Sequence, residues 1–185
     1  MKKNDVVKKI LFAAAGLSSD KGDLTIIGVD KALRTLGIWY KAQDRRSRYR
    51  VRKVFGELKR AGLIERSEGN EGMNITLTES GKSKAAWHRV KEMKLSQPKK
   101  WDKKWRIIIF DIPENLKRAR NIFRKKLKEF GFITLQRSIW IYPYECRDEI
   151  QFLSDFLVIR QYVNLIEAIR LDGEATLKER FRLKK

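Results

Sequence analysis

The sequence predicts an α+β protein, in which a helical N-terminal half with one β-hairpin precedes a half with the element order βαββαβ. Three observations lead to this prediction. Apolar residues recur at helical spacing before residue 62, and β-prone runs alternate with helical segments after residue 104. The segment "KLSQPKKWDKKW" (residues 94–105) breaks both patterns. We therefore expect domains at residues 1–92 and 105–185, joined by a linker at residues 93–104.

The first half contains three segments with a helical pattern, at residues 5–17, 29–37 and 45–62. In the third, Val51, Val54, Phe55 and Leu58 form an apolar stripe, and Gly62 is a typical C-terminal stop. Two β-prone runs then flank a Gly- and Asn-rich tip in "LIERSEGNEGMNITLT", which predicts a hairpin. "LTESGKSKAAWHRVKEM" follows as a returning helix. Three helices and a hairpin predict a winged helix-turn-helix domain.

The third helix is the candidate DNA-binding element, because the third helix of such domains enters the major groove and the hairpin touches the backbone nearby. A solvated helix face is the alternative interpretation. An arginine here could contact guanine or phosphate, and the sequence does not distinguish the two. The candidate DNA-binding residues are Arg45, Arg46, Arg48, Tyr49, Arg52 and Lys53 on the helix, and Arg66, Asn70 and Asn74 in the hairpin.

The second half begins with the strand "WRIIIF" (residues 105–110). A helical segment at residues 116–131 has Leu116, Ala119, Phe123, Leu127 and Phe130 on one face. Two further β-prone runs, "FITLQ" and "SIWIYP", precede the helical segment "RDEIQFLSDFLV" and a last strand "YVNLIEAIRL". This order predicts a ferredoxin-like domain with a short C-terminal tail.

Charge favours a polyanionic partner. The 185 residues include 43 Lys plus Arg and 23 Asp plus Glu, for a formal charge of +20, which exceeds what solubility requires. At 42% hydrophobic residues the chain can build a core, but no apolar run approaches the roughly 20 residues that span a bilayer. The N-terminal segment is typical of an amphipathic helix rather than a signal peptide, since Lys8 and Lys9 interrupt its apolar run. Double-stranded DNA is the expected partner, without a membrane.

A longer motif resembles a known family. The segment "KKWDKKWRIIIFDIPENLKRARNIFRKKLKEFGFITLQRSIWIYP" is similar to the central region of PaaX repressors of phenylacetate degradation. The resemblance implies a winged-helix domain followed by a ferredoxin-like domain similar to the CRISPR-associated protein Cas-two. Full-length PaaX repressors continue into a further C-terminal domain, whereas this sequence ends soon after "DGEATLKERFRLKK". The resemblance therefore does not extend to aromatic acyl-CoA sensing, and a small-molecule effector is unknown.

Asp111, at the end of the strand "WRIIIF", has two interpretations. In the Cas-two family an aspartate at this strand end is linked to metal-dependent nuclease activity, with paired subunits bringing two such carboxylates together. Magnesium or manganese would suit its oxygen ligands. We favour the alternative, in which Asp111 orders the turn before the next helix, together with Pro113 and Asn115.

No other catalytic set emerges. His88 lies in a basic predicted helix, where a surface position is expected. Cys146 is the single cysteine, so a packing role is expected rather than that of a nucleophile. A chain with one cysteine and no disulfide also suits a reducing cytoplasm. Trp101, Trp105 and Trp140 are expected to pack in the core or between domains. We expect a cytoplasmic, homodimeric DNA-binding transcriptional repressor without a cofactor. The alternatives are a Cas-two-like nuclease or nuclease-derived adaptor that the winged helix recruits, and a structural DNA-binding protein without sequence preference.

Overall fold

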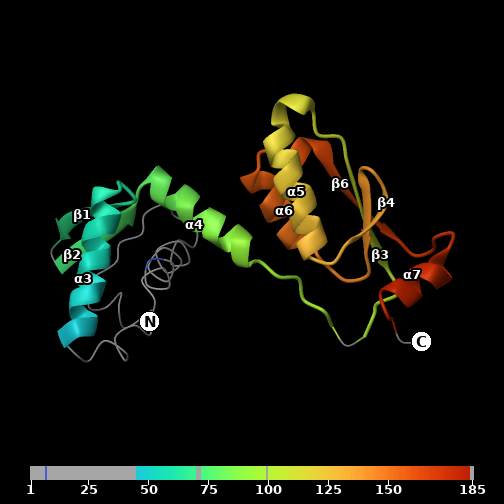
Figure 1. The fold of residues 1–185 in the computed structure, drawn as a ribbon, viewed down its shortest axis with the longest axis horizontal. Helices are drawn as coiled ribbons and strands as arrows, with labels where there is room; N and C mark the ends of the chain where they lie inside the picture. Colours follow the sequence, from blue (N-terminus) through green and yellow to red (C-terminus); the bar gives the residue numbers. More distant parts are fainter. Residues whose placement is uncertain (1–6, 8–44, 70–71, 99, 184–185) are drawn as a thin grey trace. The chain divides into compact units, whose positions relative to one another are not determined.

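The computed structural model describes residue 7 and residues 45–69, 72–98 and 100–183 (Figure 1). The helices predicted at residues 5–17 and 29–37 lie outside this part of the chain, except for Val7, which is helical. The chain divides into two compact units, Met1–Glu92 and Met93–Lys185. Among the described residues, no helix is both long enough and apolar enough to cross a membrane.

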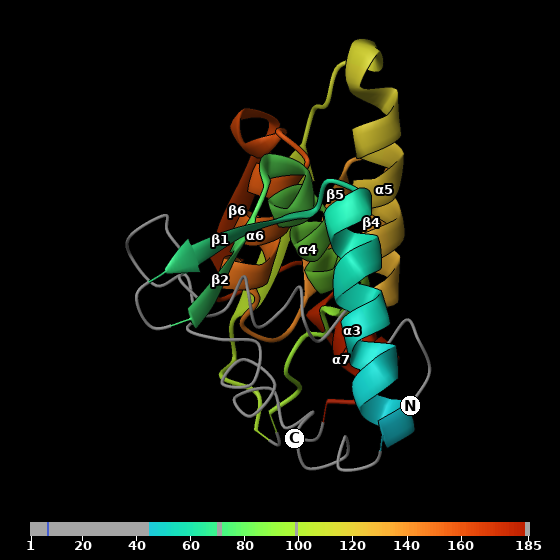
Figure 2. The ribbon, with the colours of Figure 1, turned by 90° about the vertical axis from the view of Figure 1, so that its left-hand side faces the viewer.

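The first unit contains a helix, a hairpin and a second helix in its described part. Strands β1 and β2 pair antiparallel, from Ile64 opposite Leu77 to Gly69 opposite Gly72. Figure 2 shows the two strands running side by side away from the C-terminal end of α3. The predicted third helix, hairpin and returning helix are confirmed. Their bounds are α3 (Arg45–Arg60), β1 (Ile64–Gly69), β2 (Gly72–Leu77) and α4 (Glu79–Glu92).

A compact junction joins the hairpin to both helices. Gly62 ends α3 with a positive φ of 64°, a conformation that favours glycine. The Thr78 hydroxyl donates to the Gly62 carbonyl at 2.5 Å and accepts from the Gly81 backbone N–H at 3.0 Å, which caps α4. A Cβ at Gly81 would lie 2.0 Å from the Leu63 carbonyl oxygen. Only glycine therefore allows α4 to approach the start of the hairpin this closely.

The second unit is a four-stranded antiparallel sheet with strand order β4-β5-β3-β6. The predicted βαββαβ order is confirmed, and the central strands β3 and β5 are the first and third strands of this unit. Figure 1 shows α5 and α6 side by side. The bounds are β3 (Trp105–Phe110), α5 (Lys117–Glu129), β4 (Ile133–Gln136), β5 (Ile139–Tyr142), α6 (Arg147–Phe156), β6 (Val163–Ala168) and α7 (Glu174–Arg180), with 3-10 turns η2 (Glu114–Leu116) and η3 (Arg160–Tyr162).

Both faces of this sheet carry apolar side chains. Phe110 at the end of β3 packs edge-to-face on Phe123 of α5, with ring centroids 5.3 Å apart. Trp105 is fully buried in a separate cluster with Ile141 and Leu177, so α7 covers part of the sheet. The Trp105 indole N–H donates to a Glu174 carboxylate oxygen at 3.2 Å, which fixes the start of α7.

Two features differ from the sequence expectations. Helix α7 lies where only a short tail was expected, because Leu177 is its one buried residue and one position creates no visible periodicity. Trp101 packs against Trp105 with ring centroids 4.8 Å apart, as expected for a core tryptophan, although it belongs to the predicted linker. Asp102 also forms an ion pair with Arg106, so this end of the predicted linker packs on β3. The expected core roles of Trp105 and Trp140 are confirmed, since both are buried.

Candidate nucleic-acid interface

Helix α3 has one buried face and one exposed basic face. Val54, Phe55 and Leu58 are 3%, 1% and 3% exposed, as the apolar stripe predicts. The described side chains on the opposite face are exposed, and Tyr49 is 68% exposed, which is unusual for a large aromatic residue. The exposed side chains are Arg46, Tyr49, Arg52 and Lys53, which we call the α3 face.

The other candidate residues fall around the same helix and hairpin. Asn70 lies outside the described residues. Asn74 pairs with Ser67 near the tip of the hairpin. The two strands stay in register from there to Gly69 and Gly72. Arg45 and Arg48 belong to α3, Arg66 to β1 and Asn74 to β2.

Gly56 adds an unexpected feature to the α3 face. It lies three and four positions after Lys53 and Arg52, so it shares their side of the helix. A Cβ built at Gly56 would meet no described atom within 4 Å. Glycine in a helix interior costs about 0.5–1 kcal/mol relative to alanine. Packing among the described residues therefore does not require this glycine.

Arg106 forms a buried ion-pair cluster that the sequence analysis missed. It is 3% exposed on β3, and its guanidinium donates to both carboxylate oxygens of Asp102, at 2.7 and 2.6 Å, and to Glu145 at 2.8 Å. Hydrogen bonds to Asp102 raise the pKa of Arg106 further above its ordinary value, so it stays charged. The signal in the sequence was an arginine inside an apolar strand, four residues after an aspartate. This cation therefore stabilises the fold and is not free to bind DNA.

Asp111 is exposed after β3, and the predicted capping role is wrong. Its backbone N–H donates to the Tyr162 carbonyl at 3.1 Å. Neither η2 nor α5 has a side-chain hydrogen bond at its N-cap, so Asp111 and Asn115 do not cap these helices. Among the described residues, no group of three or more His, Cys, Asp or Glu residues could hold a metal ion. Within the described part of one chain, Asp111 therefore has no ligand cluster around it.

The turn after β3 is instead ordered by Arg120. Its guanidinium donates to the Ile112 carbonyl at 3.0 Å and to the Glu114 carboxylate at 2.6 Å. Ile112 is 3% exposed and anchors the connection in the core. The hydrogen bond from Arg120 and a second from Lys117 lower the pKa of Glu114. A helix side chain that reaches back to the turn thus performs the role that we had assigned to Asp111.

Burial makes the Cys146 thiol unreactive. Cys146 is fully buried, and burial raises the pKa of its thiol to about 12, so the reactive thiolate is negligible at neutral pH. His88 is half-buried in α4 and belongs to the first unit, whereas Cys146 belongs to the second. The predicted packing role of Cys146 fits its burial.

A family comparison agrees with the fold of the second unit. Residues 98–179 match the family model described as the PaaX protein central Cas2-like domain. The second unit is thus similar to a PaaX central domain. The match covers β3 to nearly all of α7 and no part of the first unit. No curated protein matches the chain closely enough to be compared with it.

Proposed function

We propose that this chain is a DNA-binding transcriptional regulator of the PaaX type that acts as a repressor, with a winged helix in residues 1–92. The observation that carries the proposal is the α3 face, on which three exposed cations and an exposed tyrosine lie opposite a buried stripe. A two-stranded hairpin follows this helix directly. The PaaX-like second unit supports the same assignment.

In the proposed complex, α3 enters the major groove and its arginines contact the bases. An exposed guanidinium such as that of Arg52 can donate two parallel hydrogen bonds to guanine, which discriminates among base pairs. Lys53 contacts phosphate, which contributes affinity without sequence information. The β1–β2 hairpin touches the backbone beside the groove. Binding should weaken steeply with salt, because each neutralised phosphate releases counterions.

We also propose a homodimer formed mainly through residues 100–185. Strands β4 and β6 are the edges of the sheet, and an edge strand offers unpaired backbone groups to a second chain. Each edge carries exposed apolar side chains, with Leu135 on β4 at 42% and Ile166 on β6 at 46% exposed. Two subunits would present two copies of α3 to two half-sites of one operator.

Selection of bound sequences from a random duplex pool tests the regulator. Wild-type protein should enrich one motif, with two half-sites if the dimer is correct. Arg52→Ala should lose preference at one position of each half-site, because the base contact is removed. Lys84→Ala is the matched control, since it removes an exposed cation from α4 in the same unit. Enrichment of no motif by the wild type would overturn the regulator in favour of a DNA-binding protein without sequence preference.

A further inference from the structure

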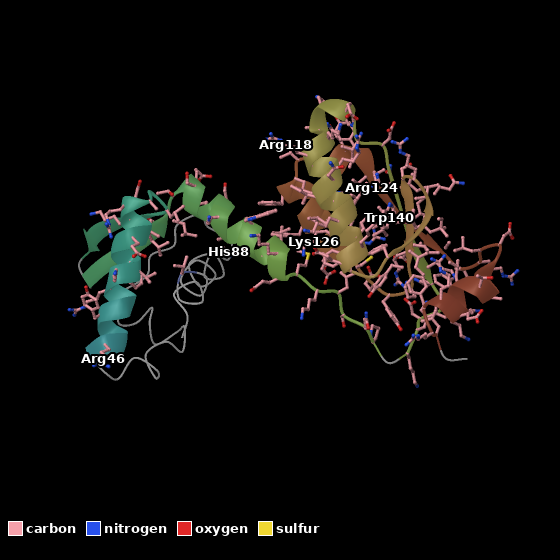
Figure 3. All side chains as sticks on the ribbon, in the orientation of Figure 1. Arg46, His88, Arg118, Arg124, Lys126 and Trp140 are labelled. Atoms are coloured by element: carbon pink, nitrogen blue, oxygen red, sulfur yellow. The ribbon has the colours of Figure 1, made fainter. Side chains whose placement is uncertain are left out.

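The outer surface of α5 carries a second row of basic side chains. Arg118, Lys125 and Lys128 are all exposed, as is Asn121 between them. Their spacing of three, four and three residues places them on one side of the helix. We call these four residues the α5 stripe. Figure 3 shows Arg118 near the N-terminal end of α5, with Arg124 and Lys126 further along the helix.

Three of the four other cations of α5 have carboxylate partners, and the fourth is the half-buried Arg124. Lys117 and Arg120 bind Glu114 at 3.1 and 2.6 Å, and Lys126 binds Glu129 at 2.8 Å. Lys126 is also 6% exposed, so it is part of the packed interior. Among the described residues, no carboxylate forms an ion pair with the three cations of the stripe. The two acids next to the stripe therefore neutralise other side chains.

The excess charge is a property of α5 and not of the unit's helices in general. The sequence of α5, "KRARNIFRKKLKE", holds seven basic residues and one acidic residue. The neighbouring helix α6, "RDEIQFLSDF", holds one basic and three acidic residues. Both helices need an apolar face for the core, and α6 provides one without a basic surface. Packing therefore does not explain the charge of α5.

Two features of the stripe are unfavourable for the helix itself, although Lys128 in the last turn suits the helix dipole. Like charges three or four positions apart repel one another on a helix surface, and Lys125 and Lys128 are such a pair. Arg118 lies in the first turn, where the positive end of the helix dipole disfavours a cation. A charge pattern that opposes local stability is expected where function requires it.

We propose that the α5 stripe is a second DNA-contacting surface, which binds the phosphate backbone of the duplex whose sequence α3 reads. This inference rests on the proposed function. From Arg118 to Lys128 the helix rises about 15 Å, which corresponds to about four phosphates of one strand along the duplex axis. Long, flexible cations separated by one and two helical turns suit such a regular row of anions. The stripe would add affinity without sequence preference.

The test compares two triple variants of the full chain that remove the same charge. The first is Arg118→Gln, Lys125→Gln and Lys128→Gln together. The control is Lys100→Gln, Arg170→Gln and Arg180→Gln, which are exposed cations of the same unit outside α5. Binding to the enriched duplex and to a scrambled duplex is measured between 50 and 200 mM salt, after circular dichroism has established that both variants fold.

For the α5 variant we expect the slope of log K against log salt to fall by about two to three, at about 0.9 per lost phosphate contact. Affinity for both duplexes should fall by the same factor, so the enriched motif remains preferred. The control should keep the wild-type slope. An unchanged slope in the α5 variant, or an equal fall in the control, would overturn the stripe but leave reading by α3 intact.

Two further outcomes separate the alternatives. Polyglutamate that binds the wild type but not the α5 variant, while the two proteins bind duplex with the same salt slope, would replace DNA with an acidic protein as the partner of the stripe. Loss of motif preference in Arg52→Ala with an unchanged salt slope of the α5 variant would support the regulator and reject the stripe. A wild type that binds neither duplex would reject both proposals.

Discussion

Arg106 on β3 and Arg52 on α3 carry the same guanidinium in opposite surroundings. Arg106 is 3% exposed and donates to two carboxylates within 2.8 Å, while Arg52 is exposed on the α3 face. The 43 Lys and Arg residues behind the net charge of +20 therefore include cations that stabilise the fold and cations that are available to a partner. Burial and pairing of the basic side chains, rather than their number, therefore define a candidate DNA-binding surface.

The largest expected effect is a loss of stability when the buried Arg106 is removed. Arg106→Ala should lower the free energy of unfolding by about 3 kcal/mol, because it leaves two carboxylates without their shared cation and opens space in the core. Chemical denaturation measures this loss. Arg52→Ala is the matched control and should change stability by less than about 0.5 kcal/mol, as exposed substitutions do. Equal losses in the two variants would remove the distinction between them.

Two helical glycines differ in the space around them, so substitution by alanine should have opposite effects on stability. Gly81→Ala should destabilise the protein by about 1–3 kcal/mol, since its Cβ would lie 2.0 Å from the backbone oxygen of Leu63. Gly56→Ala should instead stabilise it by about 0.5–1 kcal/mol, because the new methyl group meets no described atom within 4 Å and alanine favours the helix. The melting temperature should thus fall in Gly81→Ala and rise in Gly56→Ala. Shifts of the same sign would contradict the packing described for these two glycines.

The Arg106 cluster should also make stability depend on acid pH. The hydrogen bond from Arg106 lowers the pKa of Asp102, and burial opposes this shift only in part. Burial raises the pKa of Glu145, but hydrogen bonds from the Arg147 backbone N–H and from Arg106 outweigh it and lower the pKa overall. A lowered carboxyl pKa stabilises the folded state at neutral pH, and this contribution is lost as the pH falls through the folded-state pKa.

Wild-type protein should therefore lose more stability between about pH 5 and pH 3 than Arg106→Met does. The difference should be modest, up to about 1 kcal/mol, because both carboxylates are half-exposed and solvent screens them. Urea denaturation at a series of pH values measures it. Parallel pH profiles of the two proteins would show that the ion pairs contribute nothing to stability.

The smallest effect is expected at Asp111. Asp111→Asn should change the free energy of unfolding by less than about 0.5 kcal/mol, because the side chain caps neither η2 nor α5. Operator binding should also remain. Magnesium- or manganese-dependent cleavage of DNA or RNA by the wild type that disappears in Asp111→Asn would instead favour the Cas-two-like nuclease.

Periodic patterns made most of the architecture predictable. The stripes through Val54 and Leu58 on α3 and through Phe123 and Leu127 on α5 match buried residues. Alternating β-prone and helical runs predicted the βαββαβ order of the second unit, which the observed elements confirm. Periodicity works here because each of these elements buries one continuous face.

Contacts between distant residues were not predictable in the same way. The interaction of Arg106 with Glu145 spans 39 residues, and that of Trp105 with Glu174 spans 69, so no local pattern reports them. The turn after β3 misled the sequence analysis because aspartate and asparagine are typical caps, whereas Arg120 reaches back from α5 to order it. Local propensity predicted the helices and strands. Tertiary contacts decided which charged side chains stabilise the fold.

The most direct test of the central claim is the ratio of affinities for the enriched duplex and a scrambled duplex of equal length. Wild-type protein should prefer its enriched duplex by about 10³-fold or more at physiological salt. Arg52→Ala should reduce that ratio by about 10- to 100-fold at unchanged stability, which corresponds to the loss of one base contact of about 1–3 kcal/mol. A wild-type ratio near one, or a ratio that survives Arg46→Ala, Arg52→Ala and Lys53→Ala together, would contradict sequence reading by α3.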